Sequence, residues 1–123
     1  MILLMIILVG TVLTYGMLDK GRAEDAAEAQ KVEAADHGAS LFARNCAGCH
    51  GIRGQGLIGP TLNKPDNRPD DQATADQLKD LFHNTITCGR VGTAMPAWGQ
   101  TQKGPLNDFQ IGQLVALITT QGP

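Results

Sequence analysis

The sequence predicts a small all-α domain that follows one apolar N-terminal helix. Two patterns lead to this fold class: apolar residues recur at helical intervals in three segments, and no two segments alternate in the way that paired strands do. The three segments are residues 37–50, 74–89 and 106–120. A chain of 123 residues has room for one such domain and an accessory segment.

The composition limits the classes of function. The net charge of −2 and the pI of about 5.8 argue against a nucleic-acid-binding protein. Aromatic residues make up only 4% of the chain, which indicates a thin core that a disulfide, metal or cofactor would have to support. The 3 cysteines cannot all pair within one chain, so a disulfide framework is not favoured.

Residues 1–18 carry no charged side chain and are expected to form a membrane anchor. As a helix they would extend about 27 Å, close to the ~30 Å of a bilayer's hydrocarbon core. No basic residue precedes the apolar run and the following residues make a poor cleavage site, so a retained anchor is favoured over a cleaved signal peptide. Lys20 and Arg22 follow the span and, by the positive-inside rule, weakly favour a cytoplasmic position for this end.

Residues 19–36 are expected to form a solvated, largely helical linker. They are rich in Ala and Glu, which favour helices, and they offer no apolar stripe that could pack on a core. Gly21 is a candidate break. The linker is interpreted as a spacer that holds the following domain away from the membrane, with a docking surface for a partner subunit as the alternative.

The domain at residues 37–123 is expected to contain helices separated by long loops rich in Gly and Pro. In the first helix Leu41 and Phe42 face inward. The second begins with Thr74 as its N-cap, and the third is capped by Asn107 or Asp108. The residues expected on the inner faces of the second and third helices are Leu78, Phe82, Ile86, Phe109, Leu114, Leu117 and Ile118. Loops of this length in so small a domain indicate that something large packs beneath them.

The stretch NCAGCHG, residues 45–51, allows three chemistries: a redox dithiol, half of a zinc site, or covalent haem attachment. A redox dithiol usually accompanies a βαβ pattern, which this sequence lacks. A closed zinc site needs four ligands, and the remaining Cys88, His37 and His83 form no second paired cluster. Haem attachment accounts for the pattern best, because helical spacing places the Cys46 and Cys49 thiols and the His50 imidazole on one side of a turn.

From about His37 to Thr120 the chain resembles the class I c-type cytochromes. The segment GASLFARNCAGCHG is similar to the N-terminal helix and haem motif of that family, and Gly59-Pro60-Thr61-Leu62 is similar to its G-P-x-L turn. Cys88-Gly89-Arg90 followed by Ala94-Met95-Pro96-Ala97-Trp98 resembles the distal loop, and DFQIGQLVALI resembles the C-terminal helix. The resemblance implies three to four helices around one haem c bound covalently through Cys46 and Cys49.

The same resemblance implies roles for individual residues. His50 and Met95 would be the axial ligands of the iron, and the Pro60 carbonyl would accept a hydrogen bond from the His50 ring, which orients the ligand. Met95 is the only methionine outside the anchor. Arg90 is a candidate partner for a haem propionate, and Trp98 is expected to pack near the haem.

Three other residues carry side chains that could take part in chemistry. Cys88 stands where the family commonly has asparagine and is expected to be a small, half-buried residue without a chemical role, with an intermolecular disulfide or redox sensing as alternatives. His83 is expected to face water from its helix, and His37 to lie at the domain edge, and neither is expected to bind the iron.

These residues predict single-electron transfer by a membrane-anchored monohaem cytochrome, with no catalytic residues of its own. It would serve as a subunit of a respiratory or photosynthetic complex: a bc-type or alternative complex III, an oxidase or a dehydrogenase. A tethered carrier that shuttles between complexes, a haem peroxidase or gas sensor with a labile Met95, and a structural assembly subunit are the alternatives. Haem attachment of this type implies a bacterial inner membrane with the haem domain on the periplasmic side.

Overall fold

The computed structural model describes the backbone of residues 1–123 and every side chain except that of Leu18. The chain divides into two compact units, Met1–Gln30 and Lys31–Pro123. Helix α1, Ile2–Asn45, contributes to both units and has no break at Gly21. Because this helix runs without a break across both predicted boundaries, the division into an anchor at residues 1–18, a linker at 19–36 and a domain at 37–123 stays a prediction from the sequence.

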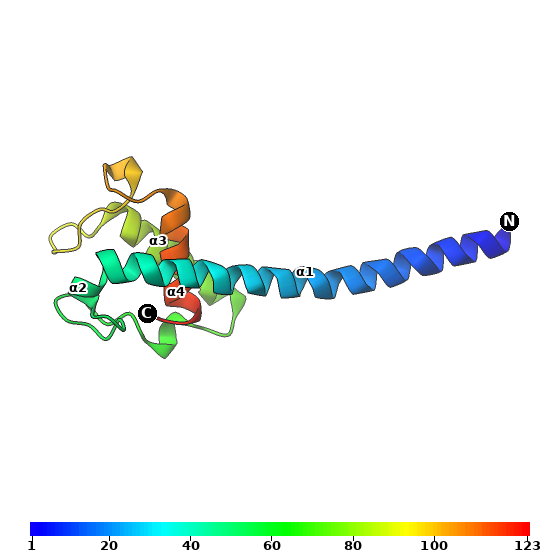
Figure 1. Ribbon diagram of the computed structural model, residues 1–123, viewed down its shortest axis with the longest axis horizontal. Coiled ribbons are helices and arrows are strands. Elements are labelled where there is room, and N and C mark those ends of the chain that lie inside the picture. The colour runs from blue at the N-terminus through cyan, green and yellow to red at the C-terminus, as the bar shows by residue number, and fades with distance from the viewer. The chain divides into compact units, whose positions relative to one another are not determined.

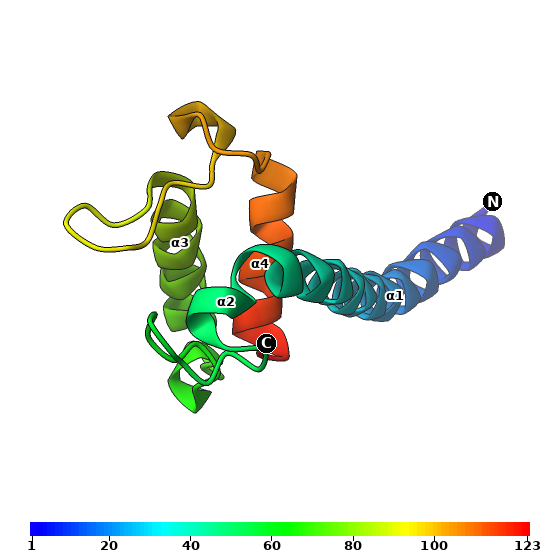
Figure 2. The same ribbon diagram turned by 60° about the vertical axis from the view of Figure 1, so that its left-hand side comes forward.

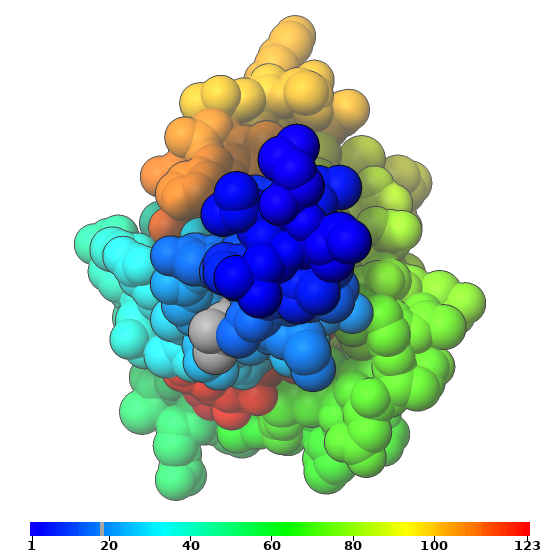
Figure 3. All heavy atoms as spheres, turned by 90° about the vertical axis from the view of Figure 1, so that its right-hand side faces the viewer, coloured from blue at the N-terminus to red at the C-terminus, as the bar shows by residue number. Residues whose placement is uncertain are grey.

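The first unit consists of the N-terminal part of α1. Its described apolar side chains are exposed all around the helix, and Figure 3 shows those nearest the N-terminus as an uncovered cluster of spheres. By length and composition, this helix is the one described helix that is apolar enough to cross a membrane. Apolar side chains that are uncovered on every face suit a lipid environment better than water.

In the second unit, α1 supplies Leu41 and Phe42 to the core, as the sequence predicts. The helix crosses α4, Asp108–Thr120, at Gly38. A Cβ atom at residue 38 would overlap the backbone carbonyl of Gln113 and would touch Leu117, so only glycine allows the two helices to approach this closely. Figure 2 shows α4 passing behind this part of α1.

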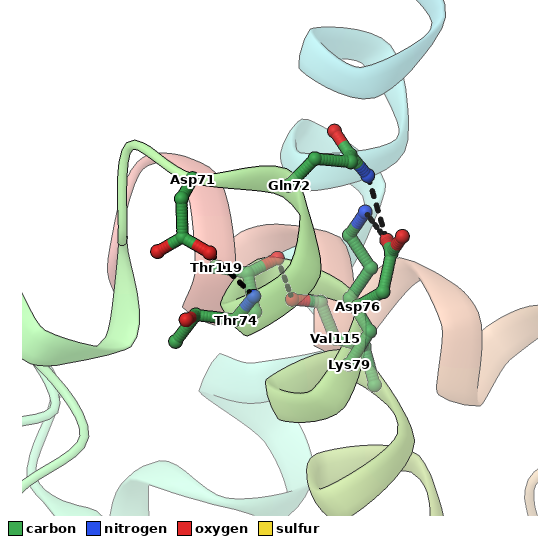
Figure 4. A network of polar contacts seen from close by, with 7 residues as sticks. All are labelled: Asp71, Gln72, Thr74, Asp76, Lys79, Val115 and Thr119. Carbon is green, nitrogen blue, oxygen red and sulfur yellow. Dashed lines mark hydrogen bonds and ion pairs between the residues drawn. The ribbon is translucent and has the colours of Figure 1, made fainter.

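Helix α3 spans Gln72–Cys88 and begins two residues before the predicted N-cap, Thr74. The cap is Asp71, whose carboxylate accepts a hydrogen bond from the Thr74 backbone N–H at 2.8 Å (Figure 4). The prediction of Thr74 as N-cap is wrong because Asp71, three residues earlier, is at the correct distance to accept that bond. The predicted inner face is present, with Ile86 buried and Leu78 and Phe82 half-buried.

Helix α4 is capped by Asn107, one of the two predicted residues, through a reciprocal capping box with Gln110. Its core face consists of Ile111, Leu114, Val115, Leu117 and Ile118. The prediction that Phe109 faces the core is wrong, because its side chain is 74% exposed. Phe109 precedes Ile111 by two residues, which places it about 200° away around the helix.

The connections between these helices contain short helical turns. In the described residues they are the 3-10 helices η1, Pro65–Asn67, and η2, Gln100–Gln102, together with the four-residue helix α2, Ala47–His50. The described residues contain no strand beyond one isolated bridge between Gly99 and Leu106. The predicted all-α fold class is thus confirmed.

Candidate functional site

The C-x-x-C-H segment forms one tight turn at the end of α1. The Cys46 N–H donates to the Phe42 carbonyl at 2.8 Å, which continues the helical pattern past Asn45. The Cys49 and His50 N–H groups both donate to the Cys46 carbonyl, at 3.1 and 2.9 Å. The backbone therefore holds two thiols and one imidazole on a single turn, as the spacing predicts.

The three side chains of this turn differ in exposure. His50 is buried, Cys46 is half-buried and Cys49 is exposed. Burial raises the pKa of the Cys46 thiol to about 11, and the nearby Cys49 adds to the rise. Cys46 is consequently a protonated thiol at neutral pH in this structure.

The His50 ring is oriented by the hydrogen bond that the resemblance to the class I c-type cytochromes implies. Its Nδ1 lies 2.8 Å from the Pro60 carbonyl oxygen. A carbonyl can only accept, so Nδ1 carries a proton, and the neutral form of the ring has its lone pair on Nε2. This tautomer is the one that binds a metal through Nε2.

Gly59 contacts the face of the His50 ring, a role that sequence reasoning missed. A Cβ atom at residue 59 would lie 2.7 Å from Cε1 and 2.9 Å from Nδ1 of His50. The Gly59 N–H donates to the Cys49 carbonyl at 2.8 Å, and the Gly56 N–H donates to the His50 carbonyl at 2.7 Å. The loop is thereby tied to the turn that it covers, and the position of Gly59 directly before Pro60 is the signal that could have revealed it.

Met95 lies in the loop that follows α3. The chain leaves the helix at Gly89, whose φ of +69° favours glycine, and the Arg90 N–H donates to the Met95 carbonyl at 3.1 Å. The Thr93 hydroxyl donates to the Arg90 carbonyl and accepts from the Met95 N–H, at 2.8 and 3.2 Å. The Met95 side chain is half-buried and packs against the same core as Cys46.

Trp98 and Arg90 occupy different surroundings. Trp98 is half-buried against the core, and its backbone bonds to Ile86 and Leu106. The Arg90 side chain is exposed. In contrast, Arg68 has a buried Nη1 without a hydrogen-bond partner among the described residues, while its Nη2 donates to Asn63 at 3.1 Å.

The remaining thiol, Cys88, and the remaining imidazoles, His37 and His83, lie outside the C-x-x-C-H turn. His83 is 2.9 Å from Asp108 through Nε2, and His37 is exposed on α1. Cys88 is exposed, so the prediction of a half-buried residue is wrong. It is the last residue of α3, where the chain turns at Gly89 and leaves the thiol uncovered. The described residues contain no cluster of three or more His, Cys, Asp or Glu side chains that could hold a metal ion.

A helical domain that presents two cysteines and an oriented histidine on one turn defines the class of c-type cytochromes. The chain belongs to the family described as "Cytochrome C oxidase, cbb3-type, subunit III", which matches residues 33–118. Members of this class carry covalently bound haem c and transfer electrons. The resemblance found in the sequence is thus confirmed.

Curated relatives agree with this assignment. The chain is 37% identical to cytochrome c55X of Stutzerimonas stutzeri over 70 residues. This aligned region covers 57% of this chain and 53% of the relative. It is 41% identical to the cbb3-type cytochrome c oxidase subunit CcoP of Azospirillum brasilense over 92 residues. This aligned region covers 66% of this chain and 28% of the relative. The chain thus spans about half or less of the length of these relatives. No solved structure gives a significant match.

Proposed function

We propose that the chain binds one haem c through thioether bonds at Cys46 and Cys49, with His50 and Met95 as the axial ligands of the iron. The observation that carries this proposal is the hydrogen bond from His50 Nδ1 to the Pro60 carbonyl at 2.8 Å. It leaves Nε2 as a ready lone-pair donor on the turn that carries both thiols. When bound, the haem supplies a one-electron couple of its iron.

The donor set suits this cofactor. Thiols add to vinyl groups, imidazole and thioether are iron ligands of c-type haem, and the bonds around Thr93 fix the backbone at Met95. Arg68 also supports haem binding. Its buried guanidinium Nη1 has no hydrogen-bond partner among the described residues and therefore requires an acceptor, and a haem propionate would be an anionic acceptor. Trp98 would contribute packing, and Arg90 would contribute positive charge at the surface.

With His50 and Met95 both bound to the iron, the site would be suited to moving one electron rather than to binding oxygen or peroxide. The protein's part is to hold the ligands, to exclude water from His50 and to leave Cys49 near the surface. We therefore propose an electron carrier without an independent enzymatic activity.

Spectroscopy of the full chain, produced with a c-type haem maturation system, tests the ligand set. We expect covalent haem that resists acid–acetone extraction, and a ferric near-infrared charge-transfer band that reports methionine sulfur on the iron. Ready binding of carbon monoxide by the reduced wild-type protein would contradict stable Met95 ligation and would favour a sensor or peroxidase.

We also propose that α1 anchors the domain in the bacterial inner membrane, with the domain in the periplasm, as one subunit of a respiratory electron-transfer complex. The uncovered apolar side chains of residues 1–17 support an anchor. Covalent attachment of haem to c-type cytochromes takes place outside the cytoplasm, which supports the periplasmic position of the domain. The similarity to an oxidase subunit of Azospirillum brasilense supports an oxidase as the complex.

A native gel of gently solubilised membranes, stained for haem, tests the assembly. A haem band that contains this chain and is far heavier than 13.0 kDa is expected, with oxidase subunits among its peptides. A band that contains this chain alone would instead identify a tethered carrier. Protease added to intact spheroplasts should degrade the domain, and protection of the domain would contradict the periplasmic orientation.

A further inference from the structure

The residues that follow α4 lie against the loop that carries Pro60. In Figures 1 and 2 the C-terminal end of the chain lies beside the loop after α2. The Gln121 and Gly122 N–H groups both donate to the Leu117 carbonyl, at 3.2 and 2.7 Å, and this fixes them to the last turn of α4. Residues 121–123 are hereafter called the post-α4 segment, and residues 51–63 the Pro60 loop.

Pro123 of the post-α4 segment packs against Gly54 of the Pro60 loop. A Cβ atom at residue 54 would lie 2.9 Å from Cγ and 3.2 Å from Cβ of Pro123, and Gly54 is buried although its loop lies at the surface. The Asn63 side-chain amide donates to the Pro123 carbonyl at 3.4 Å, which adds a second, longer contact. The post-α4 segment therefore touches the loop on both sides of Pro60 in the sequence.

The carbonyl group of Gly54 closes the Pro60 loop. It accepts hydrogen bonds from the Thr61 hydroxyl at 3.0 Å and from the N–H groups of the next two residues at 2.7 and 3.1 Å. All three donors belong to the residues that directly follow Pro60. A displacement of Gly54 would therefore displace the Pro60 carbonyl, which is the hydrogen-bond acceptor of His50.

Gly122 lies against two side chains of the same region. A Cβ atom at residue 122 would lie 2.5 Å from Nη1 of Arg68 and 2.8 Å from Oδ1 of Asn63. Arg68 Nη2 also donates to this Asn63 oxygen, at 3.1 Å. A larger residue at position 122 would have to push these side chains away, and its backbone would be strained because φ is +78° there.

We propose, on the basis of the proposed ligation of the iron by His50, that the post-α4 segment positions this ligand. Gly122 and Pro123 hold the Pro60 loop so that its carbonyl stays within hydrogen-bond distance of His50 Nδ1. A hydrogen bond donated by Nδ1 makes the imidazole a more basic ligand, which favours ferric iron. Loosening the post-α4 segment should therefore raise the reduction potential of the haem.

A segment that only stabilised the fold would have a different effect. Its loss would lower the Tm, but the bond between His50 and Pro60 would persist in the molecules that remain folded. The contacts that lead from Pro123 through Gly54 to the residues after Pro60 predict a local effect on the ligand instead. Measurements on the folded, haem-loaded protein separate the two cases.

Variants of the full-length, haem-loaded chain test the proposal through the reduction potential and the hydrogen exchange of the His50 Nδ1 proton, followed by NMR in the reduced protein. Pro123→Gly and Gly122→Ala should each raise the potential and speed this exchange about threefold to tenfold. Pro123→Val keeps carbon atoms at the β and γ positions and should resemble the wild type. Gln121→Ala changes an exposed side chain of the same segment and should alter neither measurement.

The possible outcomes separate this inference from the proposed function. If Pro123→Gly and Gly122→Ala keep the wild-type potential and exchange rate, with or without a lower Tm, the positioning inference fails while ligation by His50 stands. If Gly122→Ala does not fold, Pro123→Gly, which adds no atom, decides alone. If the wild-type chain binds no haem after maturation, the proposed function and this inference fail together.

Discussion

The Nδ1 atom of His50 lies 2.8 Å from the carbonyl oxygen of Pro60, and Gly59 packs against the face of the same ring. The two contacts fix different properties of the imidazole. The hydrogen bond sets its tautomer, and the absence of a side chain at residue 59 sets its position. Both come from one loop whose N–H groups bond to the C-x-x-C-H turn.

Gly59→Ala should displace the His50 ring. The added methyl would lie 2.7 Å from Cε1, well inside van der Waals contact, so either the ring or the loop must move. We expect a loss of about 1–3 kcal/mol in the free energy of unfolding and a lower haem content. Thermal unfolding and haem-to-protein ratios measure both.

Gly112→Ala is the matched control for that substitution, because a Cβ at residue 112 meets nothing within 4 Å. It lies inside α4, where alanine favours the helix by about 1 kcal/mol over glycine. Equal stability and haem content in Gly59→Ala and Gly112→Ala would show that the ring has room to move and would contradict the role assigned to Gly59.

Gly38→Ala should weaken the crossing of α1 and α4. The methyl group would overlap the Gln113 carbonyl, which belongs to backbone and cannot rotate away. A loss of about 1–3 kcal/mol is expected in denaturant unfolding of the second unit. Gly21→Ala, where the Cβ meets open space, should be neutral or stabilising, and a similar loss in both variants would argue against the close approach.

Asp71→Ala should destabilise α3 in a pH-dependent way. The Thr74 backbone N–H bonded to this carboxylate lowers the pKa of Asp71 below its usual value of 3.8. Because the pKa of Asp71 is lower in the folded protein than in the unfolded one, the ionised carboxylate stabilises the folded protein at pH values above the unfolded-state pKa. This stabilisation is lost as the pH falls through the folded-state pKa. The difference in Tm between wild type and Asp71→Ala should be largest near neutral pH and should shrink below about pH 4.

Asp71→Asn separates the cap from its charge. Asparagine keeps an acceptor oxygen for the Thr74 N–H but does not titrate, so most of the stability should remain and its pH dependence should flatten. A Tm difference between wild type and Asp71→Ala that stays constant from pH 7 to strongly acidic pH would exclude the ionised cap as its source.

Met95→Ala should remove the proposed methionine ligand of the iron. We expect the near-infrared methionine band to disappear, the reduced protein to bind carbon monoxide, and the reduction potential to fall by on the order of 0.1 V. Met5→Ala, which changes an exposed methionine near the N-terminus of α1, is the control and should leave the spectrum unchanged. An unaltered potential in Met95→Ala would mean that another side chain binds the iron.

The sequence was sufficient for those features that depend on spacing. The C-x-x-C-H turn and the inner face of α3 follow from residues close together in the chain, whereas the Pro60 hydrogen bond was implied by the resemblance to the class I c-type cytochromes. The all-α class followed from periodicity, since the described residues form no strand beyond the bridge of Gly99 and Leu106. Local patterns also gave Asn107 as a cap, because its partner Gln110 is only three residues away.

Features that depend on contacts between distant segments were missed. The meeting of Gly38 with Gln113 and the orphaned Arg68 N–H leave no local pattern. Phe109 was assigned to the core because it lies at a roughly helical interval from the other apolar residues of its segment. The rotation of α4 is instead set by Ile111 and Leu114, its two most fully buried side chains. Cys88 was judged by its residue type, whereas its exposure follows from the end of α3.

Intact mass spectrometry of the full chain, purified after haem maturation and then denatured, is the decisive test of covalent haem attachment. We predict the polypeptide mass plus one haem, and the bare polypeptide mass when Cys46 and Cys49 are both replaced by alanine. Cys88→Ala, the matched control, should keep the haem. A wild-type chain at the bare polypeptide mass, or one that keeps its haem in the double variant, would contradict the account.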